Sequence, residues 1–201
     1  MAGWLRSRGG GRELDLLHYL EEIEARRTSP NGVFGLKVHS YQLRQIWGGD
    51  HESIKAFLSR FDHLVFVGRR DKLAQAVSLS RARVTQIWTS EDRRFLAEDD
   101  PRLHMEVPFN PALIAECLEM IASGELAWLR LFRATRRKPL VLEYENFVAD
   151  MAGSTRKILN ALGVQGSDLP ASPHLRKQGA KADPLLVKFR QYLGVDAGNS
   201  L

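Results

Sequence analysis

Residues 64–83 constrain the fold of this chain more than any other stretch. Residues 64–67 form a short apolar run that ends at Gly68, which is typical of a buried strand. From Asp71 onward the residues are good helix formers, and one helix face collects Leu73, Ala76, Val77 and Ser80. A strand that leads directly into a helix with one core-facing side is the repeating unit of α/β folds.

Two arginines occupy the junction between this strand and this helix, and a hydroxyl lies about two turns into the helix. These residues are Arg69, Arg70 and Ser78. Ligands of open α/β sheets bind beyond the carboxyl ends of the strands, and the start of a helix attracts phosphate. A guanidinium group can donate two parallel hydrogen bonds to one phosphate, and the serine hydroxyl is a further donor on a short side chain. The junction therefore predicts an anion site. The alternative is two solvated arginines beside an ordinary helical serine.

The remaining segments alternate between strand-like and helix-like patterns. The sequence predicts two further strands, at residues 33–39 and 140–144. Helices are predicted at residues 14–27, 41–46, 53–59, 71–88, 111–134, 155–162 and 184–193, with Ser154 as the cap of the sixth. This alternation predicts an α/β fold with a small, mostly parallel sheet of three strands.

The chain is expected to fold as one domain over residues 13–195, between a disordered N-terminus at residues 1–12 and a flexible tail at residues 196–201. The N-terminal residues are rich in Arg and Gly and carry no apolar pattern. Residues 89–111 are polar and punctuated by prolines. A loop of that length in a compact domain is typically either a lid or substrate rim, or a mobile segment.

The composition of the 201 residues narrows the function classes. No apolar run approaches the roughly 20 residues that cross a bilayer, and no secretory signal opens the chain. Cys117 is the single cysteine, which excludes an internal disulfide and favours a cytoplasmic location. No zinc or calcium ligand spacing occurs, so no metal is expected. The net charge of +5 favours anionic partners, but 24 interspersed acidic residues argue against a nucleic-acid-binding module.

Two further groups of residues are candidates for chemistry. Lys37 and His39 alternate along the predicted strand at residues 33–39 and so share a face. His39 has a side chain suited to a general base, although a structural role at a strand end is the alternative. Glu143 and Glu145 flank Tyr144. They form either a carboxylate pair or local partners for basic side chains.

Four segments together resemble the PAPS-dependent sulfotransferases of the bacterial trehalose-2-sulfotransferase type. Residues 69–78 resemble the segment of that family that binds a 3′-phosphate, and this is the specific part of the likeness. Residues 31–37 are similar to its second core strand, and residues 142–147 to the "YED" segment common in sulfotransferases. Residues 175–178 are similar to its C-terminal basic loop. The resemblance covers residues 18–193.

The resemblance implies a three-layer α/β/α fold like that of P-loop NTPases and transfer of a sulfuryl group from PAPS, 3′-phosphoadenosine-5′-phosphosulfate. The acceptor would be a hydroxyl of a sugar or glycolipid such as trehalose. By motif, Arg69 and Ser78 hold the 3′-phosphate of the donor, with Arg70 as a second ligand. A basic loop closes over the nucleotide with Arg176, Lys177 and Gln178. Lys37 and His39 are the weaker candidates on the acceptor side.

The likeness has one departure, which concerns the N-terminal part of the family. Its first strand, the loop that holds the 5′-phosphosulfate and a catalytic carboxylate precede the region matched here. Residues 1–32 contain no such loop, so the chain is expected to be N-terminally truncated and its catalytic residue is unknown. The alternative function is a catalytically inactive nucleotide- or anion-binding fragment of the same family. An unpaired sheet edge further predicts low stability or a homodimer.

Overall fold

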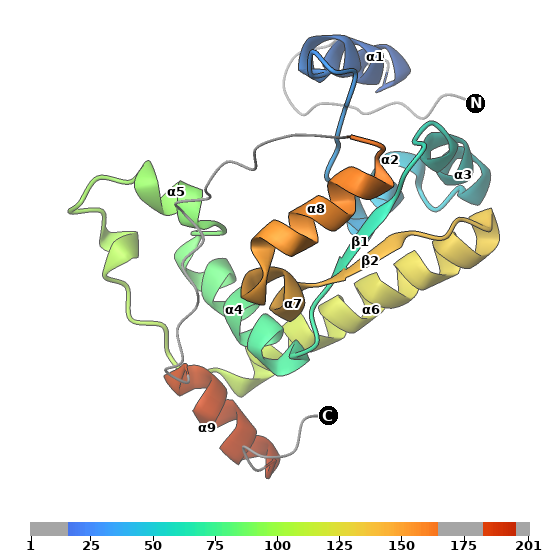
Figure 1. Ribbon diagram of the computed structural model, residues 1–201. Coiled ribbons are helices and arrows are strands. Elements are labelled where there is room, and N and C mark those ends of the chain that lie inside the picture. Colours follow the sequence, from blue (N-terminus) through green and yellow to red (C-terminus); the bar gives the residue numbers. More distant parts are fainter. Residues whose placement is uncertain (1–15, 165–182, 196–201) are drawn as a thin grey trace, which may run out of the picture. The chain divides into compact units, whose positions relative to one another are not determined.

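A computed structural model describes residues 16–164 and 183–195 (Figure 1). These residues fall into two compact units. The first unit consists of the chain up to Asp62 together with residues 124–137. The second consists of residues 63–123 and the chain from Lys138 onward. The elements in chain order are α1 (Leu16–Arg27), α2 (Ser40–Trp47), α3 (His51–Ser59), β1 (Val65–Gly68), α4 (Lys72–Thr85), α5 (Ser90–Arg94), η1 (Pro101–Leu103), α6 (Pro111–Thr135), β2 (Leu140–Glu143), α7 (Tyr144–Ala149), α8 (Met151–Ala161) and α9 (Pro184–Leu193).

The sheet lies in the second unit and consists of two parallel strands within the described residues. Strands β1 and β2 lie side by side in Figure 1 and pair in register from Val65 opposite Leu140 to Gly68 opposite Glu143. The backbone N–H of Leu140 donates to the carbonyl of Leu64 at 2.8 Å and extends the ladder by one bond. The structure thereby confirms two of the three predicted strands and their parallel pairing. The larger three-layer arrangement is not visible in this part of the chain.

The third predicted strand, at residues 33–39, is wrong. In the described structure this segment is irregular and pairs with no strand. Its ends bond locally instead. The Ser29 hydroxyl donates to the Val33 carbonyl at 2.8 Å, and the Gln42 side chain accepts from the His39 N–H at 2.7 Å. Alternating apolar residues produce a strand only where a neighbouring strand takes up the backbone groups.

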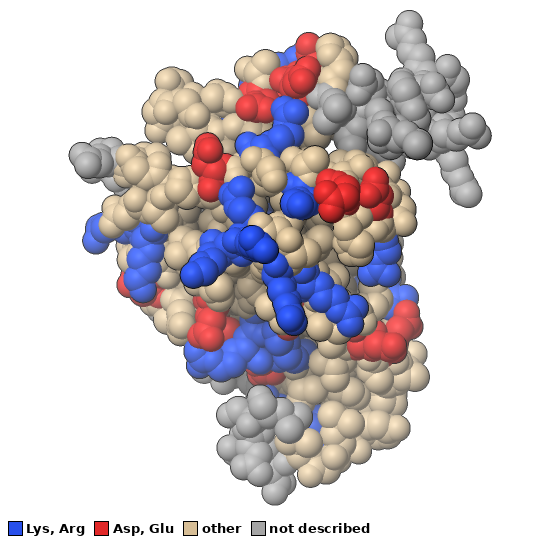
Figure 2. All heavy atoms as spheres, turned by 90° about the vertical axis from the view of Figure 1, so that its right-hand side faces the viewer, with Lys and Arg blue, Asp and Glu red and all other residues tan. Residues whose placement is uncertain are grey.

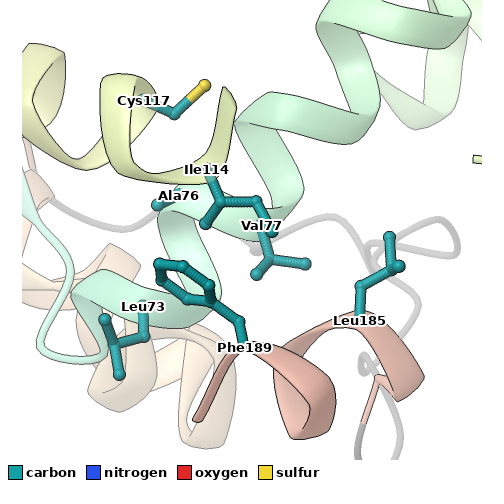
Figure 3. Close-up of a cluster of buried hydrophobic side chains, with 7 residues drawn as sticks. All are labelled: Leu73, Ala76, Val77, Ile114, Cys117, Leu185 and Phe189. Carbon is teal, nitrogen blue, oxygen red and sulfur yellow. The ribbon is translucent and has the colours of Figure 1, made fainter. Parts of the chain in front are cut away.

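The core of the second unit forms around α4 (Figure 3). It consists of Leu73, Ala76 and Val77 from α4, Ile114 and Cys117 from α6, and Leu185 and Phe189 from α9. Ser80 is also buried, and its hydroxyl donates to the Val77 carbonyl at 2.8 Å. The predicted inward face of α4 is therefore confirmed at all four positions. This packing holds the helix that follows the candidate site.

Helix α9 is also tied to α4 by two ion pairs. Asp71 caps α4 by accepting from the Ala74 N–H at 2.8 Å, and its other oxygen lies 3.0 Å from Arg190 Nη2. Asp183 caps α9 at the Leu185 N–H, and it pairs with Arg81 at 2.5 Å. The N-cap residues Asp71 and Asp183 thus also link α4 to α9 through ion pairs. These contacts fix the start of α4.

In the first unit, α2 and α3 pack through aromatic and aliphatic side chains. Leu43 is buried, as are Ile54, Phe57 and Leu58. The Phe57 ring lies 4.9 Å from the ring of Trp47 and 5.2 Å from that of Phe61, measured between centroids. Arg137, which follows α6, donates to the carbonyls of Phe61 and Asp62. This cluster gives the first unit a core of its own.

Two other predictions need adjustment. The polar stretch at residues 89–111 contains the short helical segments α5 and η1, which are capped by Thr89 and Asp100. Helix α8 begins at Met151, capped by Asp150 through the Gly153 N–H at 2.8 Å, and Ser154 is buried inside it. The predicted cap at Ser154 is therefore wrong, because the helix begins four residues earlier with Asp150, which caps about as well as serine does. Among the described helices, none combines the length and the apolar character that crossing a bilayer requires.

Candidate anion-binding site

The candidate site lies where the two strands of the second unit end. Because β1 and β2 are parallel and Gly68 pairs with Glu143, their carboxyl ends meet at the same edge of the sheet. Three residues, Arg69, Arg70 and Asp71, connect β1 to α4. Helix α7 begins directly after β2 at Tyr144. The junction that the sequence singled out is therefore adjacent to the segment at residues 143–146.

Arg69 packs against this neighbouring segment. Its side chain is 18% exposed, and its guanidinium carbon lies 4.8 Å from the centroid of the Tyr144 ring. Such stacking holds the plane of a guanidinium group without using its N–H donors. Arg69 Nε lies 3.8 Å from Glu145 Oε1 and makes no hydrogen bond to a described residue. The guanidinium group of Arg69 is thus fixed in position by Tyr144, and its Nε–H has no hydrogen-bond acceptor among the described residues.

Glu145 binds the backbone at the start of α4. Its carboxylate accepts from the Arg70 N–H at 3.0 and 3.1 Å and from the Asp71 N–H at 3.1 Å. Burial by itself would raise the pKa of this carboxyl group, but these backbone hydrogen bonds and the charge of Arg69 lower it below its ordinary value. Glu145 is therefore an ionised carboxylate seated where a helix start attracts anions.

Arg70 is committed to a different carboxylate. Its exposed guanidinium group pairs with Glu143, which also accepts from Asn146 Nδ2 at 2.8 Å. The hydrogen bond to Glu143 is the main reason that the pKa of Arg70 is raised. Of the two readings of the Glu143 and Glu145 pair, the local partner of a basic group holds for Glu143, whereas Glu145 bonds to backbone N–H groups. Of the two junction arginines, Arg69 is the one whose guanidinium group lacks a close carboxylate bond.

Ser78 and Gln75 lie on one face of α4, three residues apart. The Ser78 side chain is exposed, in contrast to the buried residues beside it. Gln75 Oε1 is buried and has no hydrogen-bond partner within the described structure. An orphaned acceptor of this kind points to a donor supplied by a ligand or by water. Gln75 was not a predicted site residue, although its spacing from Ser78 is the signal that places it on that face.

The other predicted site residues lie elsewhere. Lys37 and His39 are exposed members of the first unit, whereas Arg69 and Ser78 belong to the second. The His39 ring stacks on Tyr41 with centroids 5.6 Å apart, and burial followed by the charge of Lys37 lowers its pKa. Arg176, Lys177 and Gln178 lie outside the described residues. Within the described part of the chain, no group of three His, Cys, Asp or Glu side chains is arranged to hold a metal ion.

Some basic side chains elsewhere pair with acidic ones. Figure 2 shows Lys and Arg gathered across the middle of the face it draws, with Asp and Glu mostly toward the margins. Among the described residues, Arg83 pairs with Glu116 at 2.8 Å and Arg102 pairs with Asp100 at 2.7 Å.

A family model described as Stf0 sulphotransferase matches residues 9–191, a range that contains the whole junction. The chain belongs to the Stf0 sulphotransferase family. The resemblance seen in the sequence is thereby confirmed. Two curated relatives are trehalose 2-sulfotransferases. The one from Mycobacterium tuberculosis (strain ATCC 35801 / TMC 107 / Erdman) is 23% identical over 85% of this chain, and the one from Mycolicibacterium smegmatis (strain ATCC 700084 / mc(2)155) is 25% identical over 84%. The match spans 65% of the length of each relative.

Proposed function

We propose that this member of the Stf0 sulphotransferase family transfers a sulfuryl group from PAPS to a hydroxyl of a sugar or glycolipid, in the cytoplasm. The family match over residues 9–191 carries the proposal, because it includes the junction that sequence and geometry both single out. The names of the two relatives support trehalose as the acceptor to test first. A three-layer α/β/α arrangement of the complete sheet is part of the same proposal.

In this proposal the 3′-phosphate of the donor binds at Arg69 and Ser78. The residues present fit such a group, since Arg69 is stacked on Tyr144 with an unpaired Nε and Ser78 is an exposed hydroxyl. Arg70, held by Glu143, adds positive charge nearby. Arg176, Lys177 and Gln178 are proposed to close over the nucleotide, as the family resemblance implies.

The reaction is an in-line displacement at sulfur. The acceptor oxygen forms a bond to sulfur while the bond from sulfur to the 5′-phosphate oxygen breaks, and adenosine 3′,5′-bisphosphate leaves with the electron pair. The hydroxyl proton passes to a base. Lys37 and His39 of the first unit stay the weaker candidates for binding the acceptor, and no residue is assigned as the base. Positioning and positive charge on the leaving group supply most of the rate enhancement.

Calorimetric titration with adenosine 3′,5′-bisphosphate tests the donor site. The full chain is expected to bind it more tightly than adenosine 5′-phosphate, which lacks the 3′-phosphate. Arg69→Gln should weaken binding of the bisphosphate by about tenfold or more, the usual loss for a charged hydrogen bond. Arg156→Gln, an exposed arginine of α8, is the matched control and should leave the affinity unchanged. Absence of binding by the wild type at millimolar ligand would contradict the proposal.

Mass spectrometry of trehalose incubated with PAPS and the protein then separates the two family-based functions. An active sulfotransferase adds the mass of one sulfuryl group to the sugar. A catalytically inactive nucleotide- or anion-binding protein binds the bisphosphate and leaves the sugar unchanged. Both functions predict the same effect of Arg69→Gln on nucleotide binding.

A further inference from the structure

We propose that Glu145 determines the specificity of the anion site by sealing the backbone amides at the start of α4. A ligand phosphate is then recognised only by side chains that it can reach, those of Arg69 and Ser78. The inference deepens the proposed function and rests on it for the identity of the ligand. The role of Glu145 itself, which is to keep other anions away from two backbone N–H groups, follows from its hydrogen bonds.

The seal is visible in the hydrogen bonds of the carboxylate. Both oxygens of Glu145 lie within 3.1 Å of the Arg70 nitrogen, and one of them also accepts from the Asp71 N–H at 3.1 Å. These two amides belong to the N-cap residue of α4, a helix of 14 residues, and to the residue before it. They therefore lie at the end of the helix that attracts anions. A phosphate or sulfate oxygen that bound at this position would use the same two donors. The carboxylate therefore competes directly with any small anion for that position.

The same side chain also helps to hold Arg69. Glu145 Oε1 is 3.8 Å from Arg69 Nε, close enough for attraction but too far for a hydrogen bond. Tyr144, the residue before Glu145, supplies the ring on which the guanidinium group stacks at 4.8 Å. The two residues that follow β2, Tyr144 and Glu145, thus cover the backbone donors and orient the side-chain donor. Arg69 keeps N–H groups for a ligand because neither contact takes them up.

Glu143 provides a matched comparison within the same segment. It carries the same charge, but its partners are the exposed Arg70 guanidinium group and the Asn146 amide. No hydrogen bond joins it to the amides at the start of α4 in the described structure. Removing Glu143 therefore changes the net charge as removing Glu145 does, without opening those amides.

The experiment measures a ratio of affinities on the full chain. Calorimetry gives the affinity for adenosine 3′,5′-bisphosphate divided by that for adenosine 5′-phosphate in wild type, Glu145→Ala and Glu143→Ala. The ratio is expected to fall by about tenfold in Glu145→Ala, because open amides accept a phosphate from either nucleotide. In Glu143→Ala the ratio should not fall, because Glu145 still covers the two amides and the released Arg70 guanidinium group adds attraction for the 3′-phosphate. An unchanged ratio in Glu145→Ala, or an equal fall in both variants, overturns the inference.

A sulfate titration followed by amide NMR keeps the test independent of the nucleotide. In Glu145→Ala the Arg70 and Asp71 amide protons should move downfield with sulfate, as expected when an N–H comes to donate to an anion, and in wild type and Glu143→Ala they should show no such downfield movement. A wild type that binds neither nucleotide defeats the proposed function, while the sulfate shifts still decide the role of Glu145. If Glu145→Ala does not fold, Glu145→Gln keeps the shape and one acceptor oxygen, and the same shifts are expected at higher sulfate. Sulfate shifts in the wild type, or none in either Glu145 variant, contradict the seal.

Discussion

The helix and the strand on either side of the candidate site differ in how completely the described residues cover them. On α4, Ala76 is fully buried and Val77 is 1% exposed against α6 and α9. On the sheet, Val67 is 62% exposed and Val141 is 61% exposed. Because Val141 pairs with Phe66 rather than with Val67, the two valines lie on opposite faces of the sheet.

This difference shows that packing within the described residues fixes the helix side of the site more firmly than the strand side. The helix side is fixed by a closed core, two capped helix starts and ion pairs to α9. The strand side relies on a two-stranded ladder with apolar residues in solvent, which is marginal without further cover. The anion site is therefore held mainly from α4 and from the Tyr144 segment.

Truncation of the core that supports α4 should have the largest effect. Phe189 is 1% exposed and packs among the α4 residues. Phe189→Ala should lower the free energy of unfolding by about 3–5 kcal/mol, because it leaves a large cavity. Urea denaturation measures this change. Val187→Ala, on the exposed side of the same helix, is the control and should change it by less than about 0.5 kcal/mol. Equal losses in both variants would show that α9 does not support α4 as described.

Loss of the cap of α4 should come next and should reach the site. Asp71→Ala removes a cap and the partner of Arg190, so unfolding should become easier by about 1–2 kcal/mol and nucleotide binding weaker. Asp50→Ala removes a comparable cap from α3 in the first unit. It should cost a similar free energy and leave binding unchanged, as thermal melts and calorimetry can establish. A loss of binding in both variants would mean that the effect is general destabilisation.

The pH dependence of stability should report the Glu145 seal. Because folding lowers the pKa of this carboxyl group, its stabilisation is fully present above the ordinary value of 4.5 and is lost as pH falls through the lower folded value. The difference in unfolding free energy between wild type and Glu145→Gln should thus be constant from pH 7 to about 5 and shrink below that. Urea denaturation at several pH values measures it. A difference that grows on acidification would contradict the lowered pKa.

The smallest effect on stability is expected at the sheet. Val67→Lys combined with Val141→Lys should change the unfolding free energy by less than about 0.5 kcal/mol per site, because both side chains are exposed. The same double variant should abolish the predicted homodimer, since charges on exposed strands prevent sheet-to-sheet association. Light scattering after size-exclusion chromatography measures the mass. Val187→Lys, on α9, should leave it unchanged, and a monomeric wild type would contradict the dimer.

Local signals explain which parts of this chain could be predicted. The strand that ends at Gly68, the helix behind Asp71 and the helix that begins at Pro184 depend on short apolar runs, caps and prolines, which act within a few residues. The strand predicted at residues 33–39 failed because pairing requires a partner that no local pattern reveals. Ser154 failed as a cap because Asp150 competes for the same role.

For the site, the sequence by itself determined that Arg69 and Ser78 flank the start of a helix after a strand, and that the chain resembles a sulfotransferase family. Only the tertiary structure decided how their neighbours are used. Glu145 reaches the Arg70 and Asp71 amides from 75 and 74 residues away, and Glu143 pairs with Arg70 across 73. These contacts exist because parallel pairing brings the carboxyl ends of β1 and β2 together. Strand pairing acts over distances in the chain that no local spacing encodes.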